Sequence, residues 1–573
     1  MPASSLFFST SRTASIVAVL LAALFGASLA FYLYGWGVID PTNVHWLLTE
    51  GDPFQHFIGW DAFRRDEWRW PLGAIPQLGT LIDSSIVFTD SIPLIALPLK
   101  LFHSWLPDPF QYQGLVMLAN LTLNAALACV LAQRLGARPL NAVLLAALVA
   151  MLPIVTLRGL GAHGHEALTA HWLILLVVLW SLSLRPAGGW VLLRWLLLLA
   201  AAVLVHFYLF FMVGTLWFAW WACQLWRKGR ARQWTGLFFL LAAGWISAVS
   251  VLAIMWGAGY LQYGLEVGRN TGFGYYSAEF LTYLNPLSAA WFFDGDLDGA
   301  SRLIPGWITR IQGQYEGQAY AGVGVLVLLT AGLLVAVRRG EWNELKELRL
   351  ETRVLGVAMV GLFLFALGDR LVIGKMVTDI PYPEWTRILT QYLRSSGRLV
   401  WPLLYGLVLL ALVILLHKTR RRTVSAILGV AVLLQWLDLA DTHDFIRDNL
   451  NQRVAAAASG PPFAVINDPQ VKAWLKDSER IAYLPGDDLG ALKPYMWLAV
   501  RHDLPLNVAY LARVNTKALV NATRPEVMTL EQGRLELGTL YAITDDALAQ
   551  HACEIDKAKC FEIDGVTLVV RVK

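Results

Sequence analysis

The sequence is poor in charge, poor in cysteine and lacks the motifs of nucleotide hydrolysis. Only 15% of its 573 residues are charged, whereas soluble domains are nearer a quarter charged, so an ordinary soluble protein is excluded. Of its four cysteines, Cys129 and Cys223 lie in apolar runs, where buried thiols are expected. No Walker-type phosphate loop is found, so the sequence shows no site for the ATP hydrolysis that would drive transport. No nucleic-acid partner is expected.

Long uncharged runs of residues are the main feature of the sequence. The chain is 57% hydrophobic, has a mean hydropathy of +0.52 and contains 25 tryptophans, which suits extensive membrane–water interfaces. The run at 195–226 is too long for one span, so we expect two helices that turn near residues 206–208. We interpret the run at 16–34 as a retained first helix, not a cleaved signal peptide. About eleven transmembrane helices are predicted, in a mainly α polytopic fold.

Basic clusters favour cytoplasmic loops and therefore set the topology. With the N-terminus inside, the outward stretches are 35–108, 158–166, 257–318 and 369–398, together with the C-terminal tail. Residues 91–105 then lie along the outer interface. We expect a transmembrane domain over 1–441, with a long first outer loop at 35–108 and an outer loop at 257–318, and an outward-facing domain over 442–573.

The tail alternates apolar segments with helical ones and predicts a small α/β domain. Its expected strands are 480–484, 507–511, 539–543 and 561–572. Cys553 and Cys560 lie in this domain, seven residues apart. In an oxidising periplasm a disulfide between them is expected, while zinc would need further Cys or well-spaced His nearby.

The first outer loop contains the most informative acid, Asp52, in the run Gly51-Asp52-Pro53-Phe54. An acidic side chain at the outer surface could deprotonate a nucleophile or hold a metal ion or an acceptor hydroxyl. The alternative is a helix N-cap, because Asp before Pro commonly starts a helix. Further along the loop, Asp61, Asp66 and Glu67 are expected to be solvated charges on a helix face.

This Asp-Pro-aromatic step resembles the first-loop motif of oligosaccharyltransferase catalytic subunits and, more broadly, of the GT-C glycosyltransferases, which take sugars from polyprenyl-phosphate carriers. The resemblance implies that Asp52 is the catalytic base or positions the acceptor. It also implies the cytoplasmic turn seen at residues 134–136 and a C-terminal periplasmic domain. Gln55 and His56 depart from the oligosaccharyltransferase pattern, so protein N-glycosylation is not supported, and His56 becomes a candidate substrate contact.

The whole chain also looks like a group of uncharacterised bacterial GT-C-like membrane proteins, through the segments 275–279, 315–320 and 394–398. This likeness implies a multi-pass protein of the bacterial inner membrane with its C-terminal domain in the periplasm. GT-C proteins often have a second acid near the first, and Asp90 is the candidate. Asp83 competes with it for that role, and Asp90 could instead cap an interface helix.

Histidines gather at the outer end of the fourth span, where His163, His165, Glu166 and His171 lie close in sequence. Imidazole and carboxylate suit several divalent metals, but hydrogen-bonded histidines at a helix end are as ordinary. We expect His165 or His171 to contact a sugar or carrier phosphate. No metal ligand is assigned.

Arg394 and Arg398 are four residues apart, so on a helix they would share one face. Two guanidinium groups there could clamp the carrier phosphate, or simply snorkel to lipid headgroups. Glu316, before the eighth span, could bind sugar hydroxyls or pair with one of these arginines. The aromatic residues of 257–318 could stack on sugar rings or anchor the loop at the interface.

The function that fits these features is transfer of a sugar from a polyprenyl-phosphate carrier to a periplasmic acceptor. The expected partners are that lipid-linked sugar, membrane lipids and the acceptor; a divalent metal is possible but not supported. One rival is a membrane transporter or lipid flippase, against which the sequence shows no clear internal repeat. The other is a noncatalytic assembly protein that uses its periplasmic domain to bind partners.

Overall fold

The computed structural model describes residues 12–49, 51–183, 189–261, 272–287, 299–307, 310–339, 348–512 and 516–573. Parts of the predicted outer loop 257–318 therefore lie outside the described residues. The chain forms two compact units. Unit 1 takes its described residues from Met1–Ile39, Gly114–Val251 and Asn270–Leu450, and unit 2 from Asp40–Gln113, Leu252–Arg269 and Asn451–Lys573.

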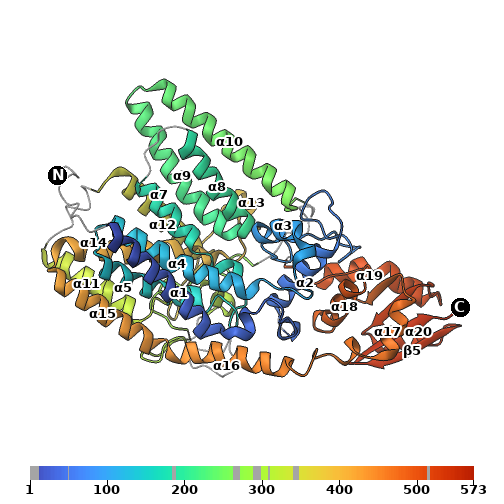
Figure 1. The fold of residues 1–573 in the computed structure, drawn as a ribbon. Helices are drawn as coiled ribbons and strands as arrows, with labels where there is room; N and C mark the ends of the chain where they lie inside the picture. Colours follow the sequence, from blue (N-terminus) through green and yellow to red (C-terminus); the bar gives the residue numbers. More distant parts are fainter. Residues whose placement is uncertain are drawn as a thin grey trace. The chain divides into compact units, whose positions relative to one another are not determined.

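Unit 1 is a bundle of helices (Figure 1). The long helices that build it are α1 (Arg12–Ile39), α4 (Gln113–Arg134), α5 (Pro139–Ala150), α7 (Trp172–Ser183), α8 (Gly189–Val205), α9 (Phe207–Arg230), α10 (Trp234–Ala258), α11 (Val323–Arg339), α12 (Leu350–Ala366), α14 (Trp401–Lys418), α15 (Arg421–Asp438) and α16 (Ala440–Ala457). The first residue of α4 and the last turns of α10 and α16 belong to unit 2. Short helices α6 (Pro153–Thr156) and α13 (Arg387–Thr390) lie between them.

Six helices in the described residues are long and apolar enough to cross a membrane. The number rises to seven if α15 and α16, which are bent by 47° at their junction, count as one span. These helices bear out a membrane-associated, mainly helical protein.

Small residues let the helices of unit 1 approach closely, as is common where membrane helices pack. A Cβ atom added to Gly26 of α1 would lie 2.4 Å from the Leu121 carbonyl oxygen of α4. At Gly324 of α11, the same addition would meet the Ala431 carbonyl of α15. Larger side chains at either glycine would therefore force the paired helices apart.

The predicted division of the 195–226 run into two helices is confirmed. α8 ends at Val205 and α9 begins at Phe207, with His206 at the break. His206 is the N-cap of α9, and its Nδ1 accepts a 3.1 Å hydrogen bond from the Tyr208 amide. The side chain thus satisfies an amide that the start of a helix leaves without a partner.

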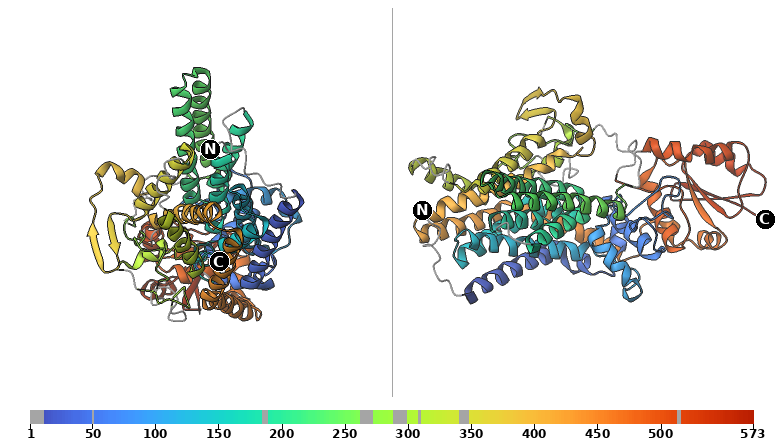
Figure 2. Two further views of the ribbon diagram at one scale, coloured as in Figure 1. Left: turned by 90° about the vertical axis from the view of Figure 1, so that its left-hand side faces the viewer. Right: turned by 90° about the horizontal axis from the view of Figure 1, so that it is seen from above.

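Unit 1 also contains a short antiparallel hairpin, β1 (Arg370–Ile373) with β2 (Met376–Asp379). Figure 2 shows it in yellow at the edge of this unit in both views. It follows Gly368, whose φ of +69° turns the chain out of α12.

Unit 2 contains a four-stranded sheet in the order β3-β4-β6-β5, namely Arg480–Leu484, Thr539–Ile543, Val566–Arg571 and Ala558–Ile563. β3 and β4 are parallel, and the other pairs are antiparallel. The predicted strands 480–484 and 539–543 are confirmed. The predicted strand 561–572 is a hairpin, because Asp564 and Gly565 both adopt positive φ and reverse the chain.

The predicted strand 507–511 is wrong. Only Leu506, just before it, bridges Ile481 of β3, and residues 508–511 have no regular structure. The side chain of Asn507 instead caps this edge: its Oδ1 accepts from the Tyr483 amide and its Nδ2 donates to the Tyr483 carbonyl.

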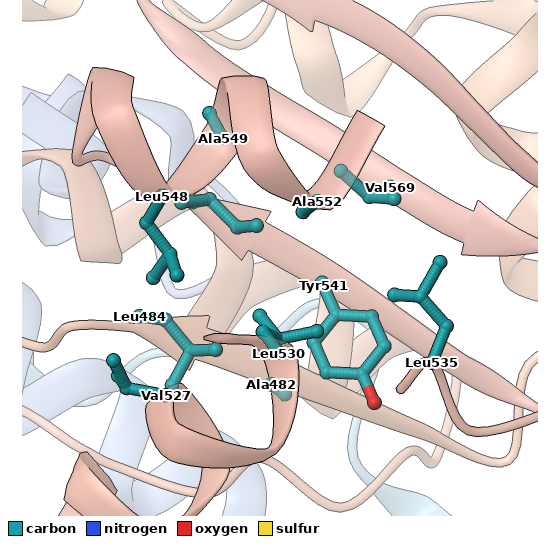
Figure 3. Packing of buried hydrophobic residues seen from close by; sticks show 11 residues of the cluster. Ala482, Leu484, Val527, Leu530, Leu535, Tyr541, Leu548, Ala549, Ala552 and Val569 are labelled. Carbon is teal, nitrogen blue, oxygen red and sulfur yellow. The ribbon is translucent and has the colours of Figure 1, made fainter. Parts of the chain in front are cut away.

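Helices cover both faces of the sheet. α19 (Thr516–Glu531) and α20 (Asp546–Cys553) bury one face, where Leu530, Tyr541 and Val569 meet (Figure 3). On the other face, Tyr483 of β3 packs against Tyr495 of α18 (Leu489–Arg501). α17 (Pro469–Lys476) completes the C-terminal helices. A disulfide joins Cys553 at the end of α20 to Cys560 of β5.

Most of the predicted first outer loop, residues 40–108, belongs to the same compact unit as residues 451–573. Its helices are α2 (Asp52–Arg65) and α3 (Pro93–Leu101). The amides of Gly79 and Thr80 both donate to the Leu506 carbonyl at 2.9 Å, and the Leu506 amide donates to Gln77. Backbone hydrogen bonds thus join residues 77–80 to Leu506. No local sequence pattern predicts this pairing.

Candidate functional site

Asp52 is the first residue of α2, but it is not the helix cap. The N-cap position is Gly51, which has no side chain to cap the helix. The half-buried Asp52 carboxylate instead accepts, at Oδ1, a 2.9 Å hydrogen bond from the Tyr510 hydroxyl. The capping alternative is therefore wrong, although an acid in the first turn remains favourable for the helix dipole.

The surroundings of Asp52 are fixed by contacts among three segments of unit 2. Gln55, one turn along α2, donates through Nε2 to the carbonyls of Tyr510 at 3.1 Å and Phe88 at 3.4 Å. The Ala512 amide also donates to the Phe88 carbonyl at 2.8 Å. Gln55 is buried, so these bonds hold the segment bearing Tyr510 against the start of α2.

Lys493 on α18 lies in the electrostatic neighbourhood of Asp52, and Arg453 lies in that of Lys493. Burial lowers the pKa of Lys493 on α18, while the Asp52 carboxylate opposes this and the Arg453 charge adds to it. Lys493 is half-buried, as is Arg453 on α16. Lys493, Arg453 and Tyr510 could not be identified from local sequence patterns, because all three lie about 400 residues or more along the chain from Asp52. Together with Asp52 they make a mixed-charge cluster in unit 2.

His56 and Asp90 lie on the segments that frame this cluster. His56 is buried in α2, and its carbonyl accepts a 2.6 Å hydrogen bond from the Ser91 hydroxyl. Asp90 is partly exposed and has a φ of +51°. The cap of α3 is Ile92 rather than Asp90, and the apolar Ile92 side chain makes no capping hydrogen bond. Its competitor Asp83 is exposed.

Asp61 is not a solvated charge, contrary to the prediction. Its side chain is 0% exposed and lies between Arg65, at 3.5 Å, and Arg501, at 3.3 Å. Both arginines also bind Asp108, at 2.6 and 2.5 Å. Glu67, in contrast, is 87% exposed, as expected. The buried network ties α2 to α18 within unit 2.

Unit 1 brings together the three segments that carry the resemblance to bacterial GT-C-like proteins. The Gly397 amide donates to the Tyr276 carbonyl at 2.9 Å. A Cβ atom added to Gly317 would lie 2.5 Å from Ala278 Cα, and one added to Gly397 would lie 2.6 Å from Gly317 Cα. Glycine is therefore required for 275–279, 315–320 and 394–398 to lie this close.

At this junction Glu316 bridges two buried arginines. Arg398 binds both carboxylate oxygens, at 2.7 and 2.9 Å, and Arg158 binds Oε2 at 2.7 Å and the Glu316 carbonyl at 3.0 Å. All three side chains are less than a tenth exposed. Burial favours the neutral acid, but Arg398 and Arg158 outweigh it and hold the pKa of Glu316 well below its usual range.

The predicted clamp of Arg394 and Arg398 on one helical face is not formed. Residues 396–400 are a 3-10 helix (Ser396–Val400), and Arg394 lies in the preceding turn. Arg398 is buried against Glu316, while Arg394 lines a separate pocket with Asp369 and Arg370. The i, i+4 spacing was misleading because the chain is not α-helical across Ser395 and Gly397.

The histidines of this region are dispersed among different partners. Burial, and then the Arg158 charge, lower the pKa of His163 well below its usual value, so the ring is neutral and stacks on Tyr315. His171 Nδ1 lies 2.8 Å from the Tyr405 hydroxyl. His165 is partly exposed near Glu316. No group of three His, Cys, Asp or Glu that could hold a metal occurs in the described parts of the chain.

Comparison with known proteins gives the family but no activity. No curated protein matches the chain. Residues 470–571 match the model described as the DUF6311 C-terminal domain. Residues 23–440 match the model described as Domain of unknown function (DUF6311), which covers well over half of the sequence. The chain therefore belongs to the DUF6311 family.

Proposed function

We propose that this protein is an integral membrane glycosyltransferase that moves a sugar from a polyprenyl-phosphate carrier to a hydroxyl group of a periplasmic acceptor. The observation that supports it is the Asp52 carboxylate, which is partly exposed and held by Tyr510 instead of capping its helix. A carboxylate fixed in this way has the chemistry of a general base. The resemblance of the Asp52-Pro53-Phe54 step to GT-C first loops points to the same role.

In the proposed reaction, Asp52 removes the proton from the acceptor hydroxyl as its oxygen attacks the anomeric carbon of the donor. The new glycosidic bond forms while the bond between that carbon and the carrier phosphate oxygen breaks. The carrier phosphate leaves with the bonding electron pair. Asp90 stands as the second acid of the first loop, and His56 as a residue near the acceptor.

The developing phosphate charge requires a cation, since such charge is stabilised by preorganised donors. Arg398 is unsuited because Glu316 already binds it through two oxygens. Lys493 is the better candidate: it shares unit 2 with Asp52 and interacts with its charge. Arg394, His165 and His171 belong to unit 1, and their proposed contact with the donor rests on the chemistry of their side chains.

The proposed membrane arrangement has about eleven spans. Besides the seven counted above, unit 1 contains three shorter apolar helices, α5, α8 and α11, and the 17-residue α12. We place the protein in the bacterial inner membrane with its C-terminal domain in the periplasm, where the disulfide between Cys553 and Cys560 would be stable.

The test uses full-length protein in detergent with a panel of radiolabelled polyprenyl-phosphate sugars. Binding and cleavage of each donor are followed for the wild type, for Asp52→Asn and for Glu67→Gln, which changes an 87% exposed acid of the same loop. We expect Asp52→Asn to abolish turnover while the protein stays folded, and Glu67→Gln to retain it. Unchanged turnover in Asp52→Asn, or movement of intact donor across a vesicle membrane without cleavage, would overturn the proposal.

A further inference from the structure

Unit 1 contains a polar pocket around Arg394 that has no assigned role in the transfer step at Asp52. It has a volume of about 470 Å³ and is lined by the segment Gly272–Tyr276 together with Asp369, Arg370 and Arg394. Small-molecule sites usually have volumes of about 300–1,000 Å³. The pocket is therefore large enough for a monosaccharide.

Glycines allow the wall of this pocket to form. A Cβ atom added to Gly274, whose φ is +83°, would lie 1.7 Å from Asp369 Oδ1. One added to Gly272 would lie 3.1 Å from Arg394 Cβ. The carboxylate and the arginine thus reach the pocket only because glycine occupies both positions.

Aromatic packing behind the pocket supports this wall. The ring of Phe273 packs against Phe365 of α12 at 5.4 Å and against Tyr382 at 5.3 Å. Burial, together with the nearby Asp369 charge, raises the pKa of Tyr382. The site is therefore built on the end of α12, and does not rest on a surface loop alone.

The lining offers more positive than negative charge. Arg394 lies over the Tyr276 ring, 6.0 Å from its centroid. Arg370 is 57% exposed and only loosely paired with Asp379, at 3.6 Å. Besides these two guanidinium groups, the pocket lining contains one carboxylate, that of Asp369. Its Oδ1 is buried, with no hydrogen-bond partner in the described part of the chain.

These groups define the ligand chemistry. Two guanidinium groups recognise phosphate or carboxylate oxygens, because their fixed forks of donors match such anions. A carboxylate accepts hydrogen bonds from ring hydroxyls, and the tyrosine rings offer flat apolar faces. Neither a neutral sugar nor an acyl chain would use both features.

We propose that the pocket binds a pyranose ring that carries an anionic group. Its source is either the sugar-phosphate head of a lipid carrier or a free acidic sugar, such as a uronic acid unit of a polysaccharide. The anion lies against Arg370 and Arg394, and the ring lies against Tyr276 with its hydroxyls directed to Asp369. This binding does not depend on sugar transfer at Asp52.

The test measures equilibrium binding to full-length protein in nanodiscs with glucuronic acid, glucose 1-phosphate, glucose and a polyprenyl-phosphate glucose. The anionic sugars, free or lipid-linked, bind and glucose does not. Arg394→Ala and Arg370→Ala each weaken binding about tenfold or more, since each removes a charged hydrogen-bond partner. Arg394→Lys keeps the charge and retains part of the affinity.

Controls separate the pocket from the rest of the protein. Arg349→Ala removes an arginine that is 69% exposed beyond the pocket and leaves binding unchanged. The Asp52→Asn variant binds the free anionic sugars with wild-type affinity. Loss of sugar transfer at Asp52 is thereby distinguished from loss of binding in the pocket. Binding of the lipid-linked sugar alone identifies the carrier as the source. Failure of every anionic probe to bind a folded wild type, or equal loss in Arg349→Ala, overturns the proposal.

Discussion

The Tyr510 hydroxyl donates a 2.9 Å hydrogen bond to Oδ1 of Asp52, 458 residues away in the sequence. This bond joins the first helix of the outer loop to the segment that leaves the C-terminal sheet, within one compact unit. A hydrogen bond from a hydroxyl to a carboxylate favours the ionised acid. Tyr510 is therefore placed to keep Asp52 in the state that a general base needs.

Replacement of Tyr510 by Phe removes this donor with little change of shape. We expect turnover of the lipid-linked sugar to fall, and the acid limb of the pH–rate profile to move to higher pH, because Asp52 is then protonated more easily. The measurement is turnover against pH for the wild type and Tyr510→Phe. Tyr541→Phe, in the core of the sheet, is the matched control. An unshifted profile in Tyr510→Phe would show that the bond is only structural.

Replacement of Glu316 by Gln leaves Arg158 and Arg398 buried without their carboxylate. Breaking a buried ion pair in this way typically costs about 3–5 kcal/mol of the free energy of unfolding. We therefore expect a clear fall in the thermal midpoint of the protein in detergent. Glu67→Gln, which changes an 87% exposed side chain, is expected to leave the midpoint unaltered. Equal midpoints for the two variants would contradict a stabilising role for the buried bridge.

The stability of unit 1 should fall in two separate pH ranges. His163 has a lowered pKa, so the unfolded chain takes up a proton as pH falls below about 6.5 while the folded protein does not, and stability declines. Glu316 has a pKa well below 4.5, so its contribution is complete above that pH and is lost as pH falls through the folded pKa.

Thermal midpoints between pH 3 and pH 8 test this assignment. His163→Gln should reduce the decline that begins near pH 6.5, and Glu316→Gln should reduce the one that begins below about pH 4.5. If Glu316→Gln changed only the upper range, the roles given to the two groups would be wrong.

The strands at 480–484 and 539–543 were predictable because both are buried on each face, which gives short uninterrupted apolar runs. The break at His206 was predictable because the apolar run exceeded the length of one span. The failed strand at 507–511 shows the limit: its apolar residues are buried by tertiary contacts, and only Leu506 bridges β3.

Asp52 could be identified from its position after the first apolar run, whereas its partner could not. Nothing local to Tyr510 indicates that its hydroxyl meets an acid in another part of the chain. The same holds for Asp61, which was expected in solvent but is buried between two arginines. Long-range ion pairs decide such cases, and a single sequence does not record them. The spacing of Arg394 and Arg398 misled because it presupposed a helix that the turn at Ser395 prevents.

The disulfide between Cys553 and Cys560 allows a test of both structure and compartment. In denatured protein that has not been reduced, a thiol reagent should label Cys129 and Cys223, which are free, and all four cysteines only after reduction. Because the closed loop has about eight residues, the Cys553→Ser/Cys560→Ser variant should lose about 2.5 kcal/mol of the free energy of unfolding of the C-terminal domain. Labelling of Cys553 before reduction, in protein taken directly from cells, would place this domain in a reducing compartment and contradict the proposed periplasmic location.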